Sequence, residues 1–445
     1  MSGEWAEFEF PADGRPGHRA VRWNADIRLD GGNVTDRLAT ELPAHAADLM
    51  EIAAAAYAAD RRTQRGRSRA YGLGWSRKLR VGIEVRDPGL WRGHREHLSE
   101  LLTWLTDDTW DLRFRPARRP GPLHVPQGYL VDLIPEGAPV ALFSGGLDST
   151  AGLAAELAAA PGRGVIAVRV ISNDRMQGRQ RKVIEQLGGR VHDCAFRCHL
   201  RQNTPAREST QRTRGFLFLS AGIATAWAAG RQALRVYENG IGAINLPMLE
   251  SQWGSQSPHA VHPLTTQKME KLAESLSGEP FRIELPYLWS TKAELLRQAP
   301  PQMAAAYGLS YSCDTAFSTH TEGGRPCGKC TSCILRTQSV IASGLRHIDA
   351  GQRCRADRAE VIGSWEMRAM LCQVNRLGRA LRSADPWRRL LEEFPQIRDV
   401  PDVESERGRR ELLGLYGRYC AEWRDTAREL GISLRDWGLE GAAAA

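Results

Sequence analysis

Apolar positions follow two alternating patterns through the middle of the chain. Short apolar runs rich in Val, Ile and Leu are typical of buried strands, and the longer segments between them carry apolar residues at helical spacing. Strands that alternate with helices in this way predict a Rossmann-like, doubly wound parallel sheet within residues 136–350. The expected strands are residues 139–143, 164–170, 189–196, 233–238 and 280–286, and the expected helices are residues 149–160, 178–188, 215–230, 265–277 and 291–299.

The two flanking regions have patterns of their own. Residues 1–135 mix strand and helix patterns without a catalytic constellation, which predicts an N-terminal α/β accessory domain that positions or recognises another component. Residues 351–445 predict a helical C-terminal region with a disordered tail at 441–445. The expected elements are strands at 20–29, 78–87 and 110–117, helices at 44–62, 94–107, 358–383, 386–394 and 408–430, and a proline-rich linker at 115–128.

Length and charge narrow the class of protein. The 445 residues are enough for more than one domain. The longest apolar-rich run, residues 216–229, is shorter than the roughly 18 apolar residues of a membrane-spanning helix, and no signal-peptide pattern precedes it. We therefore expect a cytoplasmic protein without membrane contact. A net charge of +8 allows a nucleic-acid partner, but the basic residues are spread along the chain and do not favour one.

The most informative stretch is PVALFSGGLDST, residues 139–150, where an expected strand ends in two glycines. Glycines let backbone N–H groups turn towards an anion, and the next helix adds its positive N-terminus. The loop differs from a Walker A loop because it lacks the final G-K-[ST], and an ordinary turn capped by serine is the alternative. Asp148 is a candidate Mg²⁺ ligand or a cap of the loop. The candidate ATP-binding residues are Ser144, Gly145, Gly146, Leu147, Asp148, Ser149 and Thr150.

Four of the nine cysteines lie close together in the sequence. Cys313 precedes the run CGKCTSC, which contains Cys327, Cys330 and Cys333. Two C-x-x-C steps and a fourth thiol suit tetrahedral Zn²⁺, and four protein ligands leave no open position, so the predicted zinc site is structural. A [4Fe–4S] cluster and free buried thiols are the alternatives.

Two motifs together resemble a known family. SGGLDST resembles the pyrophosphate loop of the N-type ATP pyrophosphatases, and SYSCDTAF…RPCGKCTSCILR resembles the zinc segment of the QueC family, the 7-cyano-7-deazaguanine synthases. The resemblance covers roughly residues 136–345 and implies an adenine nucleotide alpha hydrolase-like fold. It implies that ATP, with Mg²⁺, adenylates the carboxylate of a 7-deazaguanine-type substrate. An amine then displaces AMP to give an amide, or a nitrile after a second activation.

The same resemblance implies roles for residues outside the loop. TRGFLFLSAGIATA and LWSTKAELL resemble family segments, which makes Arg214 and Lys292 candidate catalytic residues beside Asp148. Glu238 and Asn239 lie at the end of the strand expected over residues 233–238, where a substrate ring would lie, and Arg214 is also a candidate substrate ligand. Taken alone, Lys292 and Arg214 are compatible with surface charges, and Glu238 and Asn239 with a polar loop. The other positions that match the family are Thr291, Glu294 and Arg336.

Several features depart from the QueC pattern. The gap before CGKC is longer, and GAINLPMLESQWGS, residues 242–255, stands where the family reads the deazaguanine. The added regions at both ends resemble the QueC-like proteins of bacterial anti-phage systems such as Qat and CBASS. In that setting the expected acceptor is an amine of a partner protein from the same operon rather than ammonia.

Two other functions stay open at this point. Modification of tRNA by thiolation or lysidine formation uses a similar loop, and thiolation needs a reactive cysteine near it. Cys194 and Cys198 are the candidates, although their apolar neighbours favour buried structural thiols. A nucleotide-binding scaffold without turnover is the third interpretation, and the intact SGGLDST motif argues against it.

Overall fold

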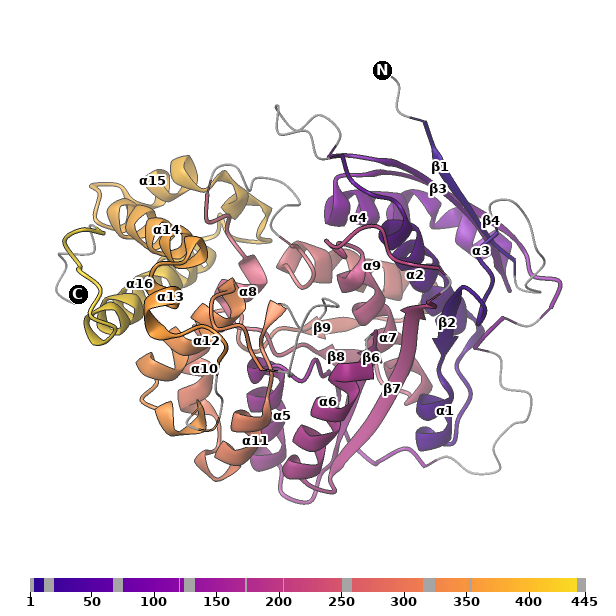
Figure 1. Ribbon diagram of the computed structural model, residues 1–445. Helices are drawn as coiled ribbons and strands as arrows, with labels where there is room; N and C mark the ends of the chain where they lie inside the picture. The colour runs from indigo at the N-terminus through magenta and orange to yellow at the C-terminus, as the bar shows by residue number, and fades with distance from the viewer. Residues whose placement is uncertain are drawn as a thin grey trace.

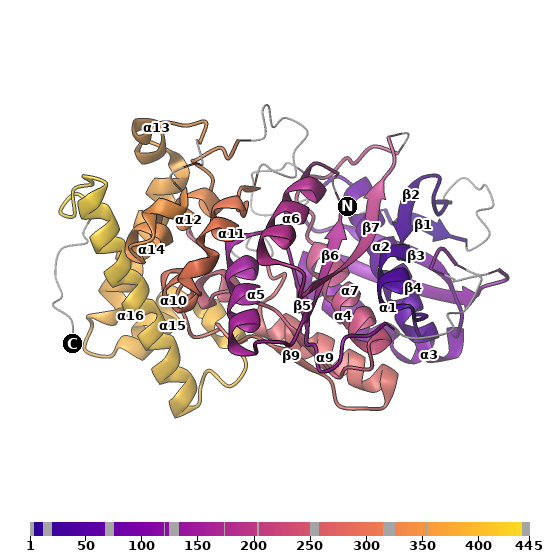
Figure 2. The same ribbon diagram turned by 90° about the horizontal axis from the view of Figure 1, so that it is seen from below.

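A computed structural model of the protein describes residues 4–11, 20–66, 75–119, 121–123, 133–172, 174–202, 204–249, 258–314, 325–349, 351 and 354–437. Figure 1 shows three parts in a row: a small sheet with helices, a central sheet covered by helices, and a group of helices. Seen from below, in Figure 2, β1 (Ala6–Phe10) and α16 (Glu406–Glu429) lie at opposite ends. Part of the predicted linker and the whole predicted tail lie outside the described residues.

The central sheet has six strands in the order β2-β7-β6-β5-β8-β9. Strand β2 runs antiparallel to β7, and all other neighbours are parallel. The chain moves from β5 through β6 to β7 and then crosses to β8 on the other side of β5, so the carboxyl ends of β5 and β8 form a topological switch point. The strands are β2 (Ile27–Asp30), β5 (Val140–Leu142), β6 (Val165–Ile171), β7 (Val191–Leu200), β8 (Ala233–Arg235) and β9 (Arg282–Glu284).

Helices cover both faces of this sheet. Neighbouring residues of β5 point to opposite faces: Ala141 shares a core with α5, α6, α10 and α11, and Val140 shares another with α2, α7 and α9. The predicted doubly wound α/β class is therefore confirmed. The helices are α5 (Leu147–Ala159), α6 (Asp174–Leu187), α7 (Arg214–Ala228), α9 (Pro263–Ser277), α10 (Lys292–Gln298) and α11 (Ala304–Leu309).

The N-terminal region shares its core with the central sheet. Its own three-stranded parallel sheet has the order β1-β3-β4. The strand expected over residues 20–29 is shorter and, as β2, joins the edge of the central sheet, because Ile27 and Leu29 bury their side chains there. The division at residue 135 stays a prediction. The remaining elements are α1 (Gly32–Leu38), α2 (Ala44–Arg62), β3 (Lys78–Val85), α3 (Pro88–Gly93), α4 (Arg95–Thr106) and β4 (Thr109–Pro116).

Helix α7 contains the long apolar run of the sequence. Its residues are mostly buried between the central sheet and α2, which lies against it. The whole described part of the chain contains no helix with the length and apolar character needed to cross a membrane.

The C-terminal helices have a core of their own that also includes residues of α8 and α12. The single helix expected over residues 358–383 is broken in two, because the Ser364 hydroxyl accepts from the N–H of Met367 and starts a new helix. Helices α8, α11 and α12 were not expected, since two are very short and the third begins inside the cysteine motif. The helices of this part are α8 (Gly240–Ile244), α12 (Thr331–Ala342), α13 (Arg358–Ile362), α14 (Trp365–Leu381) and α15 (Pro386–Glu393), with 3₁₀ turns at Pro301–Met303, Arg346–Asp349 and Pro395–Asp399.

Candidate active site

The loop between β5 and α5 has a backbone shape that only glycine fits. Gly145 has a φ of 80°, in the left-handed region, and a Cβ there would lie 2.8 Å from Gln180 Cγ. Gly146 is the N-cap residue of α5. The loop is therefore a strand-to-helix turn of the kind that presents backbone N–H groups to an anion.

The hydroxyl groups of the loop bond to one another and to the start of α5. Those of Ser144 and Ser149 lie 3.1 Å apart, and the Gly146 N–H donates to Ser144 Oγ at 3.2 Å. Ser149 and Thr150 both donate to the Gly146 carbonyl, at 3.2 Å and 2.7 Å. These two hydroxyls therefore support the first turn of α5, while the exposed Ser144 lies where it can bind a ligand.

A buried ion pair lies beside the loop. Asp148, in the first turn of α5, is paired with Lys292 Nζ, and its other carboxylate oxygen accepts from Asn239 Nδ2 at 2.7 Å. Asp148 is 4% exposed and Lys292 8%, so Lys292 is a buried charge rather than a surface one. These residues come from the segments after β5, β8 and β9 and meet at the switch point of the sheet.

The pKa values of the neighbouring carboxyl groups of Asp148 and Glu238 are shifted in opposite directions. Burial disfavours the ionised form of Asp148, but Lys292 and the hydrogen bonds outweigh it, so the pKa of Asp148 lies below its ordinary value. Burial and the negative charge of Asp148 raise the pKa of the partly buried Glu238 well above its usual range. Asn239 Nδ2 also donates to Glu238 Oε1 at 3.1 Å. The Asn239 amide therefore donates to two different carboxyl groups: that of Asp148, which is held ionised, and that of Glu238, which favours the protonated form.

Asn239 is oriented by the short helix that follows it. Its Oδ1 accepts from the Gly242 N–H at 3.1 Å and caps α8, so its NH₂ faces the two carboxyl groups. Residues 238 and 239 lie in the loop between β8 and α8, and Asn239 is the N-cap of α8. A Cβ on Gly240 would lie 2.0 Å from the Leu288 carbonyl oxygen, so the segments before α8 and α10 approach closely.

Lys292 is held in place by a capping box at the start of α10. The Thr291 hydroxyl accepts from the Glu294 N–H at 3.1 Å, and the Glu294 carboxylate accepts from the Thr291 N–H at 2.8 Å. Two residues of α16 bind this box: Glu422 accepts from the Thr291 hydroxyl at 2.7 Å, and Arg418 pairs with Glu294 at 2.6 Å. The C-terminal region therefore borders the site.

The four predicted metal ligands form one cluster. All four Sγ atoms lie within 4.8 Å of one another, with 4.0 Å between Cys327 and Cys333 and 3.9 Å between Cys330 and Cys313. A tetrahedron with Zn–S bonds of about 2.3 Å has S···S edges of about 3.8 Å. A [4Fe–4S] cluster holds its thiolates further apart, because each binds a different iron. The cluster has the geometry to hold a zinc ion.

Arg336, which matches the QueC segment, binds other residues of the protein through its guanidinium group. It is buried, binds both carboxylate oxygens of Asp349, and donates to the Tyr307 carbonyl at 2.9 Å and to Ser310 Oγ at 2.8 Å. It therefore ties α12 to the segment that leads into Cys313.

Arg214 lies at the junction with the N-terminal region. It starts α7, and its guanidinium group lies 4.8 Å from the Phe218 ring centroid. Burial lowers its pKa to about 10, partly offset by Tyr57, while Arg61 lowers it further. Both neighbours belong to α2, and Phe218 belongs to α7. The role of Arg214 at the site stays a prediction.

Cys194 and Cys198 are fully buried on β7. Burial raises the pKa of Cys194 to about 12 and raises that of Cys198 as well. These thiols match the structural interpretation and are poorly suited to carry sulfur.

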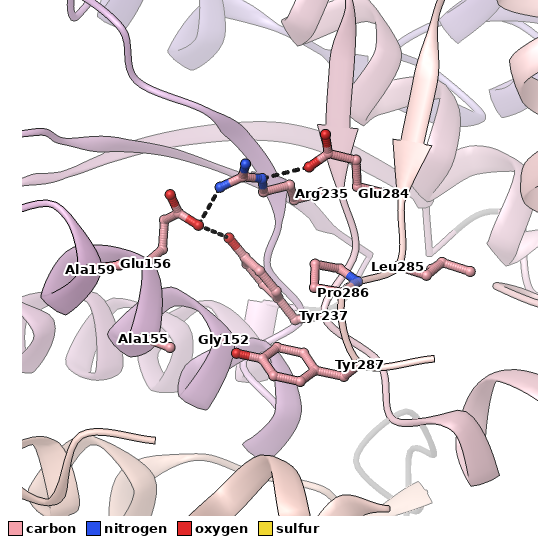
Figure 3. Close-up of a pocket in the computed structure, with 10 residues that line it drawn as sticks. All are labelled: Gly152, Ala155, Glu156, Ala159, Arg235, Tyr237, Glu284, Leu285, Pro286 and Tyr287. Carbon is pink, nitrogen blue, oxygen red and sulfur yellow. Dashed lines mark hydrogen bonds and ion pairs between the residues drawn. The ribbon is translucent and has the colours of Figure 1, made fainter. Parts of the chain in front are cut away.

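A pocket of about 560 Å³ lies along α5, β8 and β9 and includes neither Asp148 nor Lys292. Figure 3 shows its charged groups pairing with one another: Glu156 binds Arg235 and the Tyr237 hydroxyl, and Arg235 Nε lies 2.8 Å from Glu284. The pocket is separate from the ion pair and the loop.

Sequence reasoning misses several residues that border the loop or the start of α10, among them Gln180, Tyr311, Ser312 and Glu422. The Tyr311 N–H donates to the Gly145 carbonyl at 2.9 Å, and Ser312 Oγ accepts from the Leu147 N–H at 3.3 Å. The place of Ser312 directly before Cys313 was a signal that could have drawn attention to it. Glu422 has no local signal, because its contact arises from packing of α16.

The fold and the loop together define an α/β protein of the adenine nucleotide alpha hydrolase-like class with a cluster of four cysteines. The model of the family "Queuosine biosynthesis protein QueC" matches residues 206–344. This segment includes Lys292 and the four cysteines but begins after the loop. The chain therefore carries a QueC-like region.

Curated relatives match about as much of this chain as the family model does. The 7-cyano-7-deazaguanine synthase of Pseudomonas aeruginosa (strain LESB58) is 33% identical over 134 residues, 30% of this chain and 54% of that protein. That of Acinetobacter baylyi is 28% identical over 132 residues, 30% and 52% respectively. That of Leptospira biflexa is 29% identical over 133 residues, 30% and 49%. The chain spans about half the length of the curated relatives it matches.

Proposed function

We propose that the protein is an ATP-dependent synthase that adenylates the carboxylate of a 7-deazaguanine-type substrate and passes the acyl group to an amine. The main support is the meeting of the glycine loop with the buried Asp148–Lys292 pair at the switch point of the sheet. The similarity to 7-cyano-7-deazaguanine synthases supports the choice of substrate class.

The proposed reaction has two steps. A carboxylate oxygen attacks the α-phosphorus of ATP, and the bond from that phosphorus to the bridging oxygen breaks, which releases pyrophosphate. The amine nitrogen then attacks the acyl carbon, AMP leaves with the carboxylate oxygen, and the amine loses a proton. The loop residues 144–150 would bind the pyrophosphate end of ATP, and Asp148 would hold a Mg²⁺ ion that offsets negative charge on the phosphates.

The other residues have proposed roles in charge and orientation. Lys292, which pairs with Asp148 beside the loop, would place its ammonium charge next to the phosphates. Glu238 and Asn239 would line the substrate side of the site, next to the ion pair. Arg214 would bind the substrate from the α7 side of the same edge.

The acceptor is proposed to be an amine of a partner protein, with ammonia as the other candidate. The family model matches only residues 206–344, so the rest of the chain offers further surface on which a partner could bind. In this proposal those regions hold the partner. The burial of Cys194 and Cys198 counts against the thiolation alternative.

The test is mass spectrometry of the purified full chain with ATP and 7-carboxy-7-deazaguanine, with and without ammonia and proteins encoded beside it. AMP formation that depends on the deazaguanine, with an adenylate, amide or protein adduct, supports the proposal. AMP release independent of the deazaguanine refutes the substrate, and tRNA is then the next substrate to test. Nucleotide binding without AMP release supports the scaffold interpretation.

A further inference from the structure

The segment before the cysteine cluster forms one wall of the phosphate loop. Besides the contacts of Tyr311 with Gly145 and of Ser312 with Leu147, a Cβ on Gly146 would lie 3.9 Å from Ser312 Oγ and 4.0 Å from the Tyr311 carbonyl oxygen. Residues distant in sequence thus face the loop at the start of α5.

The donor that Ser312 satisfies is one that an anion would use. Leu147 is the first residue of α5, and the first N–H groups of a helix have no acceptor within the helix. In the structure this N–H donates to Ser312 Oγ. A phosphate oxygen bound to the same N–H would lie within reach of the Ser312 hydroxyl, which can also donate a hydrogen bond.

The geometry points to Ser312 as a further residue of the nucleotide site. When the pyrophosphate end of ATP enters the loop, a phosphate oxygen takes over the Leu147 N–H, and the Ser312 hydroxyl turns to donate to that phosphate. This inference rests on the proposed binding of ATP at the loop. It makes the segment of the cysteine cluster a part of the phosphate site.

Ser312 is held in this position from both sides. The next residue, Cys313, belongs to the cysteine cluster, and the N–H of Asp314 donates to Cys330 Sγ at 3.4 Å. On the other side Arg336 binds Ser310, and the guanidinium carbon of Arg179 lies 3.9 Å from the Tyr311 ring centroid. The hydroxyl therefore stays near the loop without having to be ordered by the ligand.

Two substitutions separate the hydroxyl from the fold of the segment. Ser312→Ala removes only the hydroxyl and keeps the backbone bond of Tyr311. The loss of one hydrogen bond to a charged phosphate predicts a fall of about tenfold in affinity. Ser312→Thr keeps a hydroxyl and should keep the affinity. Ser343→Ala is the matched control, because its hydroxyl bonds to Val340 in α12.

The experiment is calorimetric titration of the zinc-loaded full chain with three probes: ATP with a methylene α–β bridge, pyrophosphate, and adenosine. We expect Ser312→Ala to bind the first two about tenfold more weakly, with unchanged adenosine binding and zinc content. Ser312→Thr and Ser343→Ala should match the wild type.

Each other outcome counts against a specific claim. Equal affinity of Ser312→Ala and the wild type for both phosphate probes overturns the role of Ser312. A loss that extends to adenosine, or comes with loss of zinc, also overturns it, because it marks a structural effect. If the wild type binds neither phosphate probe, the proposed ATP-dependent function fails instead.

Discussion

The hydroxyl of Thr291 donates to Oε1 of the buried Glu422 at 2.7 Å, and this bond joins α16 to the residue that precedes Lys292. The same hydroxyl accepts from the Glu294 N–H, so its proton is directed at Glu422. Arg418, one turn earlier on α16, pairs with Glu294. Helix α16 therefore binds both residues of the capping box, and the position of Lys292 depends on the C-terminal region.

Replacing Glu422 by Ala should reduce turnover more than nucleotide affinity. The substitution removes the acceptor of Thr291 and lets Lys292 shift, so we expect kcat for AMP formation to fall at least about tenfold. The free energy of unfolding should fall by about 1–3 kcal/mol, because a buried hydroxyl loses its partner. Calorimetry with the non-cleavable ATP analogue and AMP release at saturating ATP measure the two effects.

Two further variants show whether Glu422 positions Lys292 or only stabilises the fold. Glu422→Gln keeps an acceptor oxygen and should restore most of the turnover. Glu406→Ala alters the same helix at a residue whose side chain is 97% exposed and should have no effect. Full kcat in Glu422→Ala would contradict the positioning role.

Glu422→Gln should also show a pH-dependent gain in stability. The pKa of Glu422 is raised, chiefly by burial and against the pull of Thr291 and Arg297. The folded protein thus holds this proton more tightly than the unfolded chain, so the contribution of Glu422 to stability falls as pH rises above about 4.3. Glutamine does not titrate, so the stability of the variant relative to the wild type should rise as the pH increases above about 4.3 and level off above the raised pKa of Glu422. Denaturant unfolding across this range checks it, and a pH-independent difference would contradict it.

The elements of the central sheet were predictable because each depends on local apolar pattern. Strand β6 is buried along its whole length, and α7 is an apolar helix, so the sequence indicates both directly. The alternation of Ile27 and Leu29 shows which face of β2 is buried, but it cannot show that the strand pairs with the distant β7. Strand pairing depends on the assembled fold.

The same distinction applies to the candidate site. The glycine loop and the cysteine cluster were predictable, because spacing and residue type carry their chemistry. The buried contact of Lys292 with Asp148 joins residues far apart in the chain. The loop motif indicated Asp148, but only the family resemblance pointed to Lys292. The contact of Glu422 with Thr291 arises from the packing of α16 against α10, which no local pattern encodes.

Replacing only Lys292 of the buried ion pair should destabilise the protein more than replacing both Lys292 and Asp148. Lys292→Met leaves the Asp148 carboxylate buried without its cation, which should reduce the free energy of unfolding by about 3–5 kcal/mol. The double variant Asp148→Asn/Lys292→Met leaves no unpaired charge and should recover part of that loss. Denaturant unfolding of the four proteins in this cycle measures the coupling, and both lysine variants should lack AMP formation. Simple additivity of the two single effects would contradict a coupled pair.

Loss of the cluster metal should weaken nucleotide binding as well as the fold. Metal analysis of the purified chain should find one zinc per protein, and Cys327→Ser should lose it and lower the Tm, because the metal contributes directly to folding. Since Cys313 holds Ser312 against the loop, affinity for the non-cleavable ATP analogue should also fall at temperatures well below the reduced Tm. Cys372→Ser, which lies outside the cluster, should retain zinc and affinity. Unchanged affinity after zinc loss would show that the cysteine cluster does not support the loop. If metal analysis finds iron and acid-labile sulfide, the cluster holds [4Fe–4S] and not zinc.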